Sequence, residues 1–183
     1  SAVSRGLGDV YKRQSNAEEQ IINPLIMKAT LVDGKVETAL AINEVSLLRA
    51  GPQAAKLQIW VDNRQRMDEL VCDGVLVATP AGSTAYNYSA HGPILPMGAD
   101  VLAMTALNAY RPRRWRGALL PKTAVVRIDV LDNTKRPVMA DADSISFKNV
   151  KKVEISSETK IQHRILFNEG HGLDERLIQE QFV

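Results

Sequence analysis

Alternating apolar and polar residues predict that most of this chain is built from short β-strands. Between Lys56 and Val61, the side chains of Leu57, Ile59 and Val61 share one face, while Lys56, Gln58 and Trp60 share the other. A period of two residues is the pattern of a strand with one buried face. Similar β-like stretches occur at Val36–Leu48, Ala124–Leu131 and Ile161–Phe167, with a short run at Val153 and Ile155.

Turn-forming pairs separate these stretches. They are Asp33-Gly34, Asp62-Asn63, Asp132-Asn133 and Glu169-Gly170. Gly, Asn and Asp favour tight turns, because they tolerate backbone conformations that other residues avoid. Strands and turns at this spacing, without alternating strand–helix units, favour a mainly β fold: a β-sandwich of antiparallel sheets with short helices.

Three stretches break the β pattern and predict helices. Thr84–Ala90 follows a Pro and a Gly, and Ser83 is a candidate N-cap for it. Asp100–Asn108 is rich in Ala, Leu and Met, which favour helices. Leu173–Gln181 carries apolar residues at helical spacing among charges, which indicates a short amphipathic helix.

The first residues differ from the rest. Ser1–Gln14 has no clear period and carries two glycines, so we interpret it as a non-native or disordered leader without function. Residues 15–183 are then expected to form one domain, and 183 residues are enough to bury a core.

Composition excludes some classes of partner. The 23 basic and 21 acidic residues give a net charge of +2, which does not argue for a nucleic acid or a membrane surface. No apolar run approaches the roughly 18 residues that span a bilayer. Cys72 is the single cysteine, so an intramolecular disulfide is impossible and a reducing, cytoplasmic compartment fits.

The stretch Asp73–Pro96 carries the most specific chemistry. Thr79-Pro80-Ala81-Gly82 predicts a tight turn after a buried strand, because proline fixes φ and glycine permits positive φ. A helix beginning at Ser83-Thr84 would present unpaired N–H groups and hydroxyls, which suit a phosphate or a ribose oxygen. Tyr86 would offer a flat face to a base. Gly-Ser-Thr before a helix is more often only a helix cap, so the choice between a cap and a binding site depends on the whole stretch Asp73–Pro96.

That longer pattern resembles the signature of the NAD kinases. The family shows Asp-Gly, an apolar strand, Thr-Pro-Thr-Gly-Ser-Thr-Ala-Tyr and a Ser-x-Gly-Gly-Pro ending. Here it reads Asp73-Gly74, Thr79 to Tyr86, and Ser89-Ala90-His91-Gly92-Pro93. Two positions depart from it: Ala81 stands where Thr or Ser is frequent, and His91 replaces a glycine.

A second element of the resemblance is the pair Asn43-Glu44. Alone, such a pair is usually a solvated strand edge, and strand neighbours point to opposite faces. The family carries an Asn-Glu pair upstream of its Asp-Gly, and the resemblance implies that the pair contacts the adenosine part of NAD. A carboxylate accepts hydrogen bonds from a ribose diol, and an amide both donates and accepts.

The resemblance runs roughly from Glu18 to the C-terminus and implies a set of NAD-binding residues. Tyr86 would stack, Thr84 would supply a hydroxyl or N–H, and Asp73 would face the nicotinamide–ribose end, in its own or a neighbouring subunit. The implied set is Asn43, Glu44, Asp73, Ala81, Thr84, Ala85, Tyr86, Asn87, Tyr88, Ser89 and Asn108. Asp141-Ala142-Asp143 stands where the family often shows Asp-Gly-Gln, so we assign it no contact.

NAD kinases transfer the γ-phosphate of ATP to the 2′-hydroxyl of NAD to give NADP. The resemblance implies this reaction for the complete protein, with Mg²⁺ or another divalent metal entering with ATP, and a homodimer or tetramer. The family's proton acceptor lies in a Gly-Gly-Asp-Gly segment, which does not occur in these 183 residues. We therefore expect no catalytic residue here and no activity from this chain alone.

Two other functions stay open. A free-standing dinucleotide-binding module would need no phosphate-transfer segment. The related lipid kinases share a similar two-domain plan, but nothing in that plan calls for the Thr-Ala-Tyr element.

Basic residues and histidines add little. The run Arg111, Arg113, Arg114 and Arg116 is interpreted as a solvated connection or a subunit interface, with a set that faces the phosphates of NAD or ATP as the alternative. His91, His163 and His171 lack metal-ligand spacing, so we predict no protein-bound metal, and His163 is expected to pack within its strand.

Overall fold

The computed structural model describes residues 18–167 and the single residues 178 and 182. The leader Ser1–Gln14 lies outside the described residues. So does the helix expected over Leu173–Gln181, apart from Ile178.

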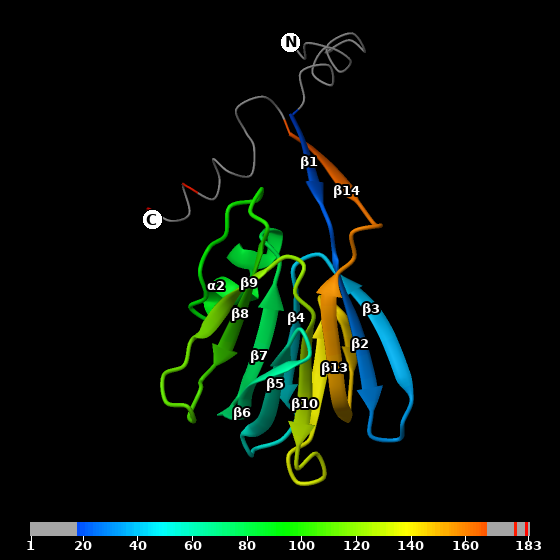
Figure 1. Cartoon of the computed structure of the whole chain (residues 1–183), viewed down its shortest axis with the longest axis vertical. Helices are drawn as coiled ribbons and strands as arrows, with labels where there is room; N and C mark the ends of the chain where they lie inside the picture. Colours follow the sequence, from blue (N-terminus) through cyan, green and yellow to red (C-terminus); the bar gives the residue numbers. More distant parts are fainter. Residues whose placement is uncertain (1–17, 168–177, 179–181, 183) are drawn as a thin grey trace, which may run out of the picture.

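Two antiparallel six-stranded sheets form the body of the described chain (Figure 1). The first sheet has the order β3 (Val36–Ala41), β2 (Leu25–Leu31), β13 (Val150–Ser157), β10 (Val126–Leu131), β5 (Ala55–Val61) and β6 (Arg64–Cys72). The second has the order β12 (Ile145–Phe147), β11 (Val138–Ala142), β4 (Glu44–Arg49), β7 (Gly74–Ala78), β8 (Val101–Leu107) and β9 (Gly117–Pro121).

The core lies between the two sheets. Leu57 and Ile128 from the first sheet are buried in one cluster with Leu47 and Val75 from the second. Strands β5 and β10 bury every second residue, as their alternation predicts. The predicted antiparallel β-sandwich with short helices is therefore confirmed.

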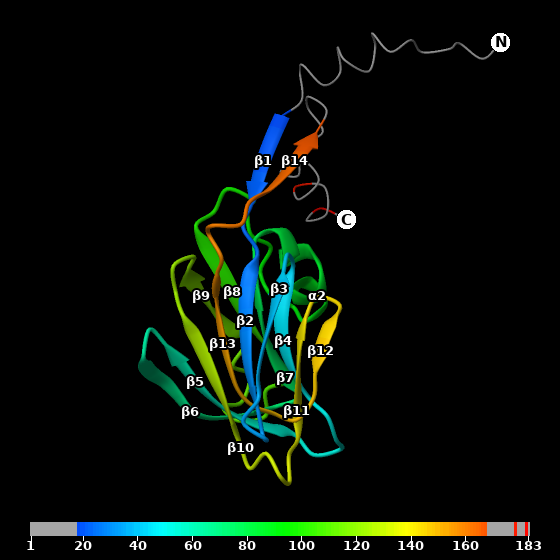
Figure 2. The ribbon, with the colours of Figure 1, turned by 90° about the vertical axis from the view of Figure 1, so that its right-hand side faces the viewer.

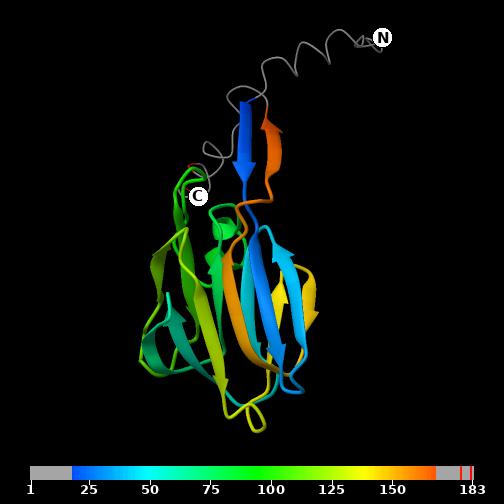
Figure 3. The same ribbon diagram turned by 45° about the vertical axis from the view of Figure 1, so that its right-hand side comes forward.

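A two-stranded ribbon extends beyond the sandwich. Strand β1 (Glu18–Ile22) pairs with β14 (His163–Phe167), and the ribbon continues the lines of β2 and β13 (Figure 3). Ile22 and Ile165 belong to a small second cluster at its base. The side chain of His163 is exposed, so the expectation that it packs inside the fold is wrong.

The helix predicted over Asp100–Asn108 is instead strand β8. Residues 102–106 are all buried, because β8 lies inside the second sheet and segment 81–92 packs on its outer face. With both faces covered, the alternation of a half-exposed strand disappears, and helix-favouring Ala, Leu and Met residues remain as the only local signal.

The single β stretch expected over Val36–Leu48 is two strands in different sheets. Strand β3 ends at Ala41 in the first sheet, and β4 begins at Glu44 in the second. The chain crosses between the layers at Ile42 and Asn43, which places the Asn-Glu pair at the crossing.

Candidate functional site

The turn after β7 is fixed against the crossing at Ile42 and Asn43. The Thr79 hydroxyl donates to the Ile42 carbonyl at 2.7 Å and accepts from the Gly82 N–H at 3.1 Å. A Cβ on Gly82 would lie 2.2 Å from the Asn43 carbonyl oxygen. Only glycine therefore fits, and the signature turn lies directly on the Asn-Glu pair.

The helix expected over Thr84–Ala90 is broken. A 3-10 turn, η1 (Ala81–Thr84), is followed by a single α turn, α2 (Tyr86–Ser89), with Ala85 between them. The backbone N–H groups of Ser83 and Ala85 donate to carbonyls within the turn. Together with Gly82, these three N–H groups are paired within the turn and are not free for a phosphate, while the contact expected from Thr84 stays a prediction.

Ser83 is not an N-cap. Neither short helix has a side-chain cap, and Ser83 is fully buried. Its hydroxyl donates to the Pro80 carbonyl at 2.8 Å and accepts from the Leu95 N–H at 3.0 Å. Ser83 therefore ties the two sides of the signature segment together.

The Asn87 amide is also directed inward. Its nitrogen donates to the carbonyls of Ser83 (3.0 Å) and Pro93 (2.8 Å), and its oxygen accepts from the Thr105 hydroxyl at 2.6 Å. Asn87 is fully buried. Its side chain thus anchors α2 on β8 and does not face the surface, so a contact of Asn87 with NAD stays a prediction for its backbone alone.

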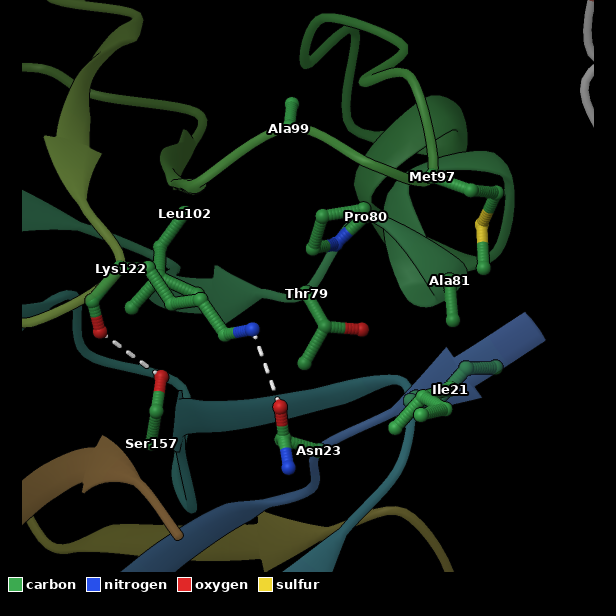
Figure 4. A pocket seen from close by; sticks show the side chains of 11 residues that line it. Ile21, Asn23, Thr79, Pro80, Ala81, Met97, Ala99, Leu102, Lys122 and Ser157 are labelled. Atoms are coloured by element: carbon green, nitrogen blue, oxygen red, sulfur yellow. Dashed lines mark hydrogen bonds between the residues drawn. The ribbon is translucent and has the colours of Figure 1, made fainter. Parts of the chain in front are cut away.

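Ala81 lies at the base of the ribbon. It lines a small pocket with Pro80, Met97 and Ile21, and it packs on the second cluster (Figure 4). Lys122 spans the same pocket, with its ammonium donating to Asn23 at 3.0 Å. The methyl group of Ala81 therefore contributes packing here.

Acidic side chains gather where α2 meets the first residue of β4. Glu44 and Tyr86 are half-buried neighbours, and the backbone of Tyr86 donates a hydrogen bond to the Glu44 carboxylate. Asp141 and Asp143 belong to the end of β11 and the turn that follows, at the same end of the sandwich as α2 (Figure 2). Among the described residues, the buried oxygens Glu44 Oε2 and Asp141 Oδ1 have no hydrogen-bond partner.

This cluster shifts the titration of two groups. Burial, and then the Asp143 carboxylate, raise the pKa of Glu44 to about 7. Burial also raises the pKa of the Tyr86 hydroxyl, with further contributions from the carboxylates of Glu44, Asp141 and Asp73. A half-buried carboxylate with an unpartnered oxygen and a raised pKa marks a candidate functional position.

Asp73 lies at the opposite end of β7. Its carboxylate accepts from Arg49 Nε at 2.7 Å and from Asn108 Nδ2 at 2.8 Å. The five residues of β7 separate Asp73 from the signature turn by about 17 Å of backbone. Asp73 and Asn108 are thus brought together, and the Asp73 carboxylate still lies near enough to Tyr86 to contribute to the raised pKa of its hydroxyl.

An open groove connects α2 to Asn108. Its lining includes Ser89, His91, Asn108, Arg114, Trp115 and Arg116. Arg114 and Arg116 are exposed in this groove, while Arg111 pairs with Glu69 at 3.8 Å. Part of the arginine run therefore borders the signature segment. Tyr88 is half exposed beside the groove.

The remaining NAD-site candidates are Thr84 and Ala85. Both are half-buried at the junction of the two short helices.

Cys72 is not a candidate nucleophile. Burial raises the pKa of its thiol to about 12, which fits a small buried side chain. No helix among the described residues is long and apolar enough to cross a membrane.

Comparison with solved structures shows that this fold is the one found in the NAD kinases. The chain superposes on yeast NADH kinase complexed with NADH with a TM-score of 0.82 at 23% identity, covering 96% of this chain and 52% of that one. The NAD kinase from Archaeoglobus fulgidus in complex with ATP gives 0.71 at 20% identity, covering 96% and 63%.

Sequence comparison gives the family. The model of the ATP-NAD kinase C-terminal domain matches residues 42–162. NAD kinases from Cereibacter sphaeroides and Hyphomonas neptunium are 69% and 55% identical over 172 residues, which are 94% of this chain and 68% of each relative. The chain therefore belongs to the NAD kinase family and spans about two thirds of these relatives.

Proposed function

We propose that this chain supplies the NAD-binding half of an NAD kinase, an enzyme that transfers the γ-phosphate of ATP to the 2′-hydroxyl of NAD. The observation that carries the proposal is the grouping of Asn43, Glu44 and Tyr86. Gly82 packs on the Asn43 backbone, Tyr86 contacts Glu44, and Glu44 Oε2 has no partner among the described residues.

These groups suit the adenosine end of NAD. The Glu44 carboxylate can accept a hydrogen bond from the ribose diol once a change of rotamer exposes its buried oxygen Oε2, and the Asn43 amide can donate or accept there. The half-buried ring of Tyr86 offers a face for stacking. In this proposal, the chain orients the 2′-hydroxyl, and positioning is a main contribution that an enzyme makes to phosphoryl transfer.

The other candidates divide by place. Thr84 and Ala85 border the adenosine end, while Tyr88, Ser89 and Asn108 border the open groove and take the nicotinamide end together with Asp73. Ala81 and Asn87 support the turn from within. The homodimer or tetramer and the cytoplasmic location expected from the sequence remain part of the proposal.

Phosphate transfer itself is assigned outside these residues. No group of three or more His, Cys, Asp or Glu side chains in the described part is placed to hold a metal ion. In the proposal, the divalent metal enters as the complex with ATP, and no step passes through this chain's side chains. The chain alone is proposed to be inactive, because the sequence contains no Gly-Gly-Asp-Gly segment.

Calorimetry with NAD tests the binding half of the proposal. We expect the chain to bind NAD, Tyr86→Ala to weaken binding by about tenfold through lost stacking, and Tyr86→Phe to retain it. Equal affinities of wild type and Tyr86→Ala would refute the site.

An activity assay tests the other half. With ATP, Mg²⁺ and NAD, the chain alone should form no NADP above background. NADP formation would refute the proposed inactivity. A complete protein that binds NAD without forming NADP would instead favour the non-catalytic module.

A further inference from the structure

Asp143 holds the backbone of the Asn-Glu pair from a turn about 100 positions further along the chain. Its carboxylate accepts from the N–H groups of Ile42 at 2.7 Å, Asn43 at 3.1 Å and Glu44 at 3.2 Å. The Asp143 N–H in turn donates to the Glu44 carbonyl at 3.2 Å. One side chain therefore holds three consecutive residues.

The need for this contact follows from the crossing between the sheets. Residues 42 and 43 lie outside both strands, so their N–H groups have no ladder partner. These hydrogen bonds lie at the surface, and a carboxylate is a stronger acceptor for such N–H groups than a neutral carbonyl. Asp143 lies in the turn between β11 and β12 with φ of +49°, a conformation that Asp tolerates better than most residues.

The same carboxylate acts on Glu44 through its charge. Asp143 is a like charge beside Glu44, and it is one of the causes that raise the pKa of Glu44. The other groups that face this cluster are Asp141, with one unpartnered oxygen, and Tyr86. Asp143 is therefore linked to both the orientation and the protonation of the carboxylate proposed to meet the ribose.

We propose that Asp143 is a positioning residue for NAD: by binding the three backbone N–H groups of residues 42–44, it directs the side chains of Asn43 and Glu44 toward the ribose diol. The inference rests on the proposed function, and it assigns Asp143 no contact with NAD itself. Asp143→Asn replaces one accepting oxygen with a donor that opposes the N–H groups.

Calorimetry with NAD at several pH values tests the proposal. Asp143→Asn should weaken NAD binding by about tenfold or more at pH 8, since charge-assisted hydrogen bonds that orient the site are lost. Asp33→Asn is the matched control, because Asp33 also accepts from a backbone N–H in a turn, that of Lys35 at 2.9 Å. The control should bind like wild type.

The pH profile separates positioning from a general loss of structure. Wild-type affinity should fall as the pH drops through about 7, where Glu44 gains its proton. In Asp143→Asn this midpoint should move to lower pH, because the like charge is gone. Weaker binding with an unmoved midpoint, or unchanged affinity, would overturn the inference. A wild-type chain that does not bind NAD would instead refute the proposed function.

Hydrogen exchange in the wild-type chain covers the case in which Asp143→Asn does not fold. The amides of residues 42–44 should exchange slowly although they lie between strands, and NAD should slow them further. Rapid exchange of these amides would contradict the role of Asp143.

Discussion

The carboxylates near the two ends of strand β7 differ in whether their oxygens have hydrogen-bond partners. At the Asp73 end, both carboxylate oxygens have partners, Arg49 and Asn108, and the ion pair is more than a third exposed on each side. At the other end, Glu44 and Asp141 each keep a buried oxygen without a partner among the described residues. Five residues of β7 separate these two arrangements.

This difference in pairing indicates which carboxylate can gain a hydrogen bond from a ligand. A carboxylate that is already paired contributes to the structure and gains little from a ligand. A carboxylate that is partly desolvated and unpaired costs stability until a hydrogen-bond donor arrives. The unpartnered oxygens at the Glu44 end support the proposed binding site there, whereas the Asp73 carboxylate is engaged in contacts within the fold.

The largest effect is expected from a substitution that forces the signature turn away from the backbone of Asn43. Gly82→Ala would place a Cβ 2.2 Å from the Asn43 carbonyl oxygen, so the turn must move. We expect a loss of about 2 kcal/mol or more in unfolding free energy, together with loss of NAD binding. Urea denaturation and calorimetry measure the two effects.

Gly98→Ala is the matched control for this substitution. A Cβ on Gly98 meets no atom within 4 Å, so stability should change by no more than about 0.5 kcal/mol. Similar losses of stability in both variants would show that the loss in Gly82→Ala does not come from the close contact between Gly82 and Asn43.

A smaller effect of mixed sign is expected at Glu44. The folded-state pKa of about 7 lies above the ordinary 4.5, so folding favours the protonated form. Glu44 therefore costs no stability below about pH 4.5, and the cost grows as the pH rises through 7. Glu44→Gln removes the charge and should stabilise the chain at pH 8 by roughly 1 kcal/mol, a value discounted for solvent screening.

The same variant should weaken NAD binding by about tenfold at pH 8, because a charged acceptor is replaced by a neutral one. Thermal denaturation at pH 4 and pH 8, beside calorimetry, follows both changes. Lower stability of Glu44→Gln at pH 8 would contradict the idea that Glu44 is a partly desolvated carboxylate with one unpartnered oxygen.

The smallest effect is expected at Asp73. Asp73→Asn weakens an ion pair that is well exposed to solvent, which is worth about 0.5 kcal/mol. Affinity for NAD should change less than in Glu44→Gln, because both oxygens of Asp73 are already engaged. A larger loss of affinity at Asp73 than at Glu44 would reverse the comparison between the two ends of β7.

The sequence predicts the half-exposed parts of the fold and misses those covered on both faces. Strands β5 and β10 alternate because one side of each meets the core, so their pattern is visible locally. Strand β8 is covered on its outer face by the segment that contains Asn87, so its sequence lacks the alternation of a half-exposed strand and resembles that of a helix. The split between β3 and β4 was hidden, because apolar residues continue through the crossing.

The candidate site was predicted only in part for a related reason. The signature segment and the Asn-Glu pair are recognisable as motifs, and the structure places them against each other. Asp143 could not be found from local patterns, since it lies about 100 positions from the residues that it holds. The inward direction of Asn87 depends on Thr105 and Pro93, which local patterns do not connect to it either.

The most direct test of the account is a thermodynamic cycle that joins the Glu44 carboxylate to the ribose 2′-hydroxyl. The affinities of wild type and Glu44→Gln are measured by calorimetry for NAD and for its 2′-deoxyadenosine analogue at pH 8. We predict that wild type prefers NAD by about tenfold and that Glu44→Gln loses most of this preference. An equal preference for NAD in both proteins would show that Glu44 does not contact the hydroxyl and would contradict the account.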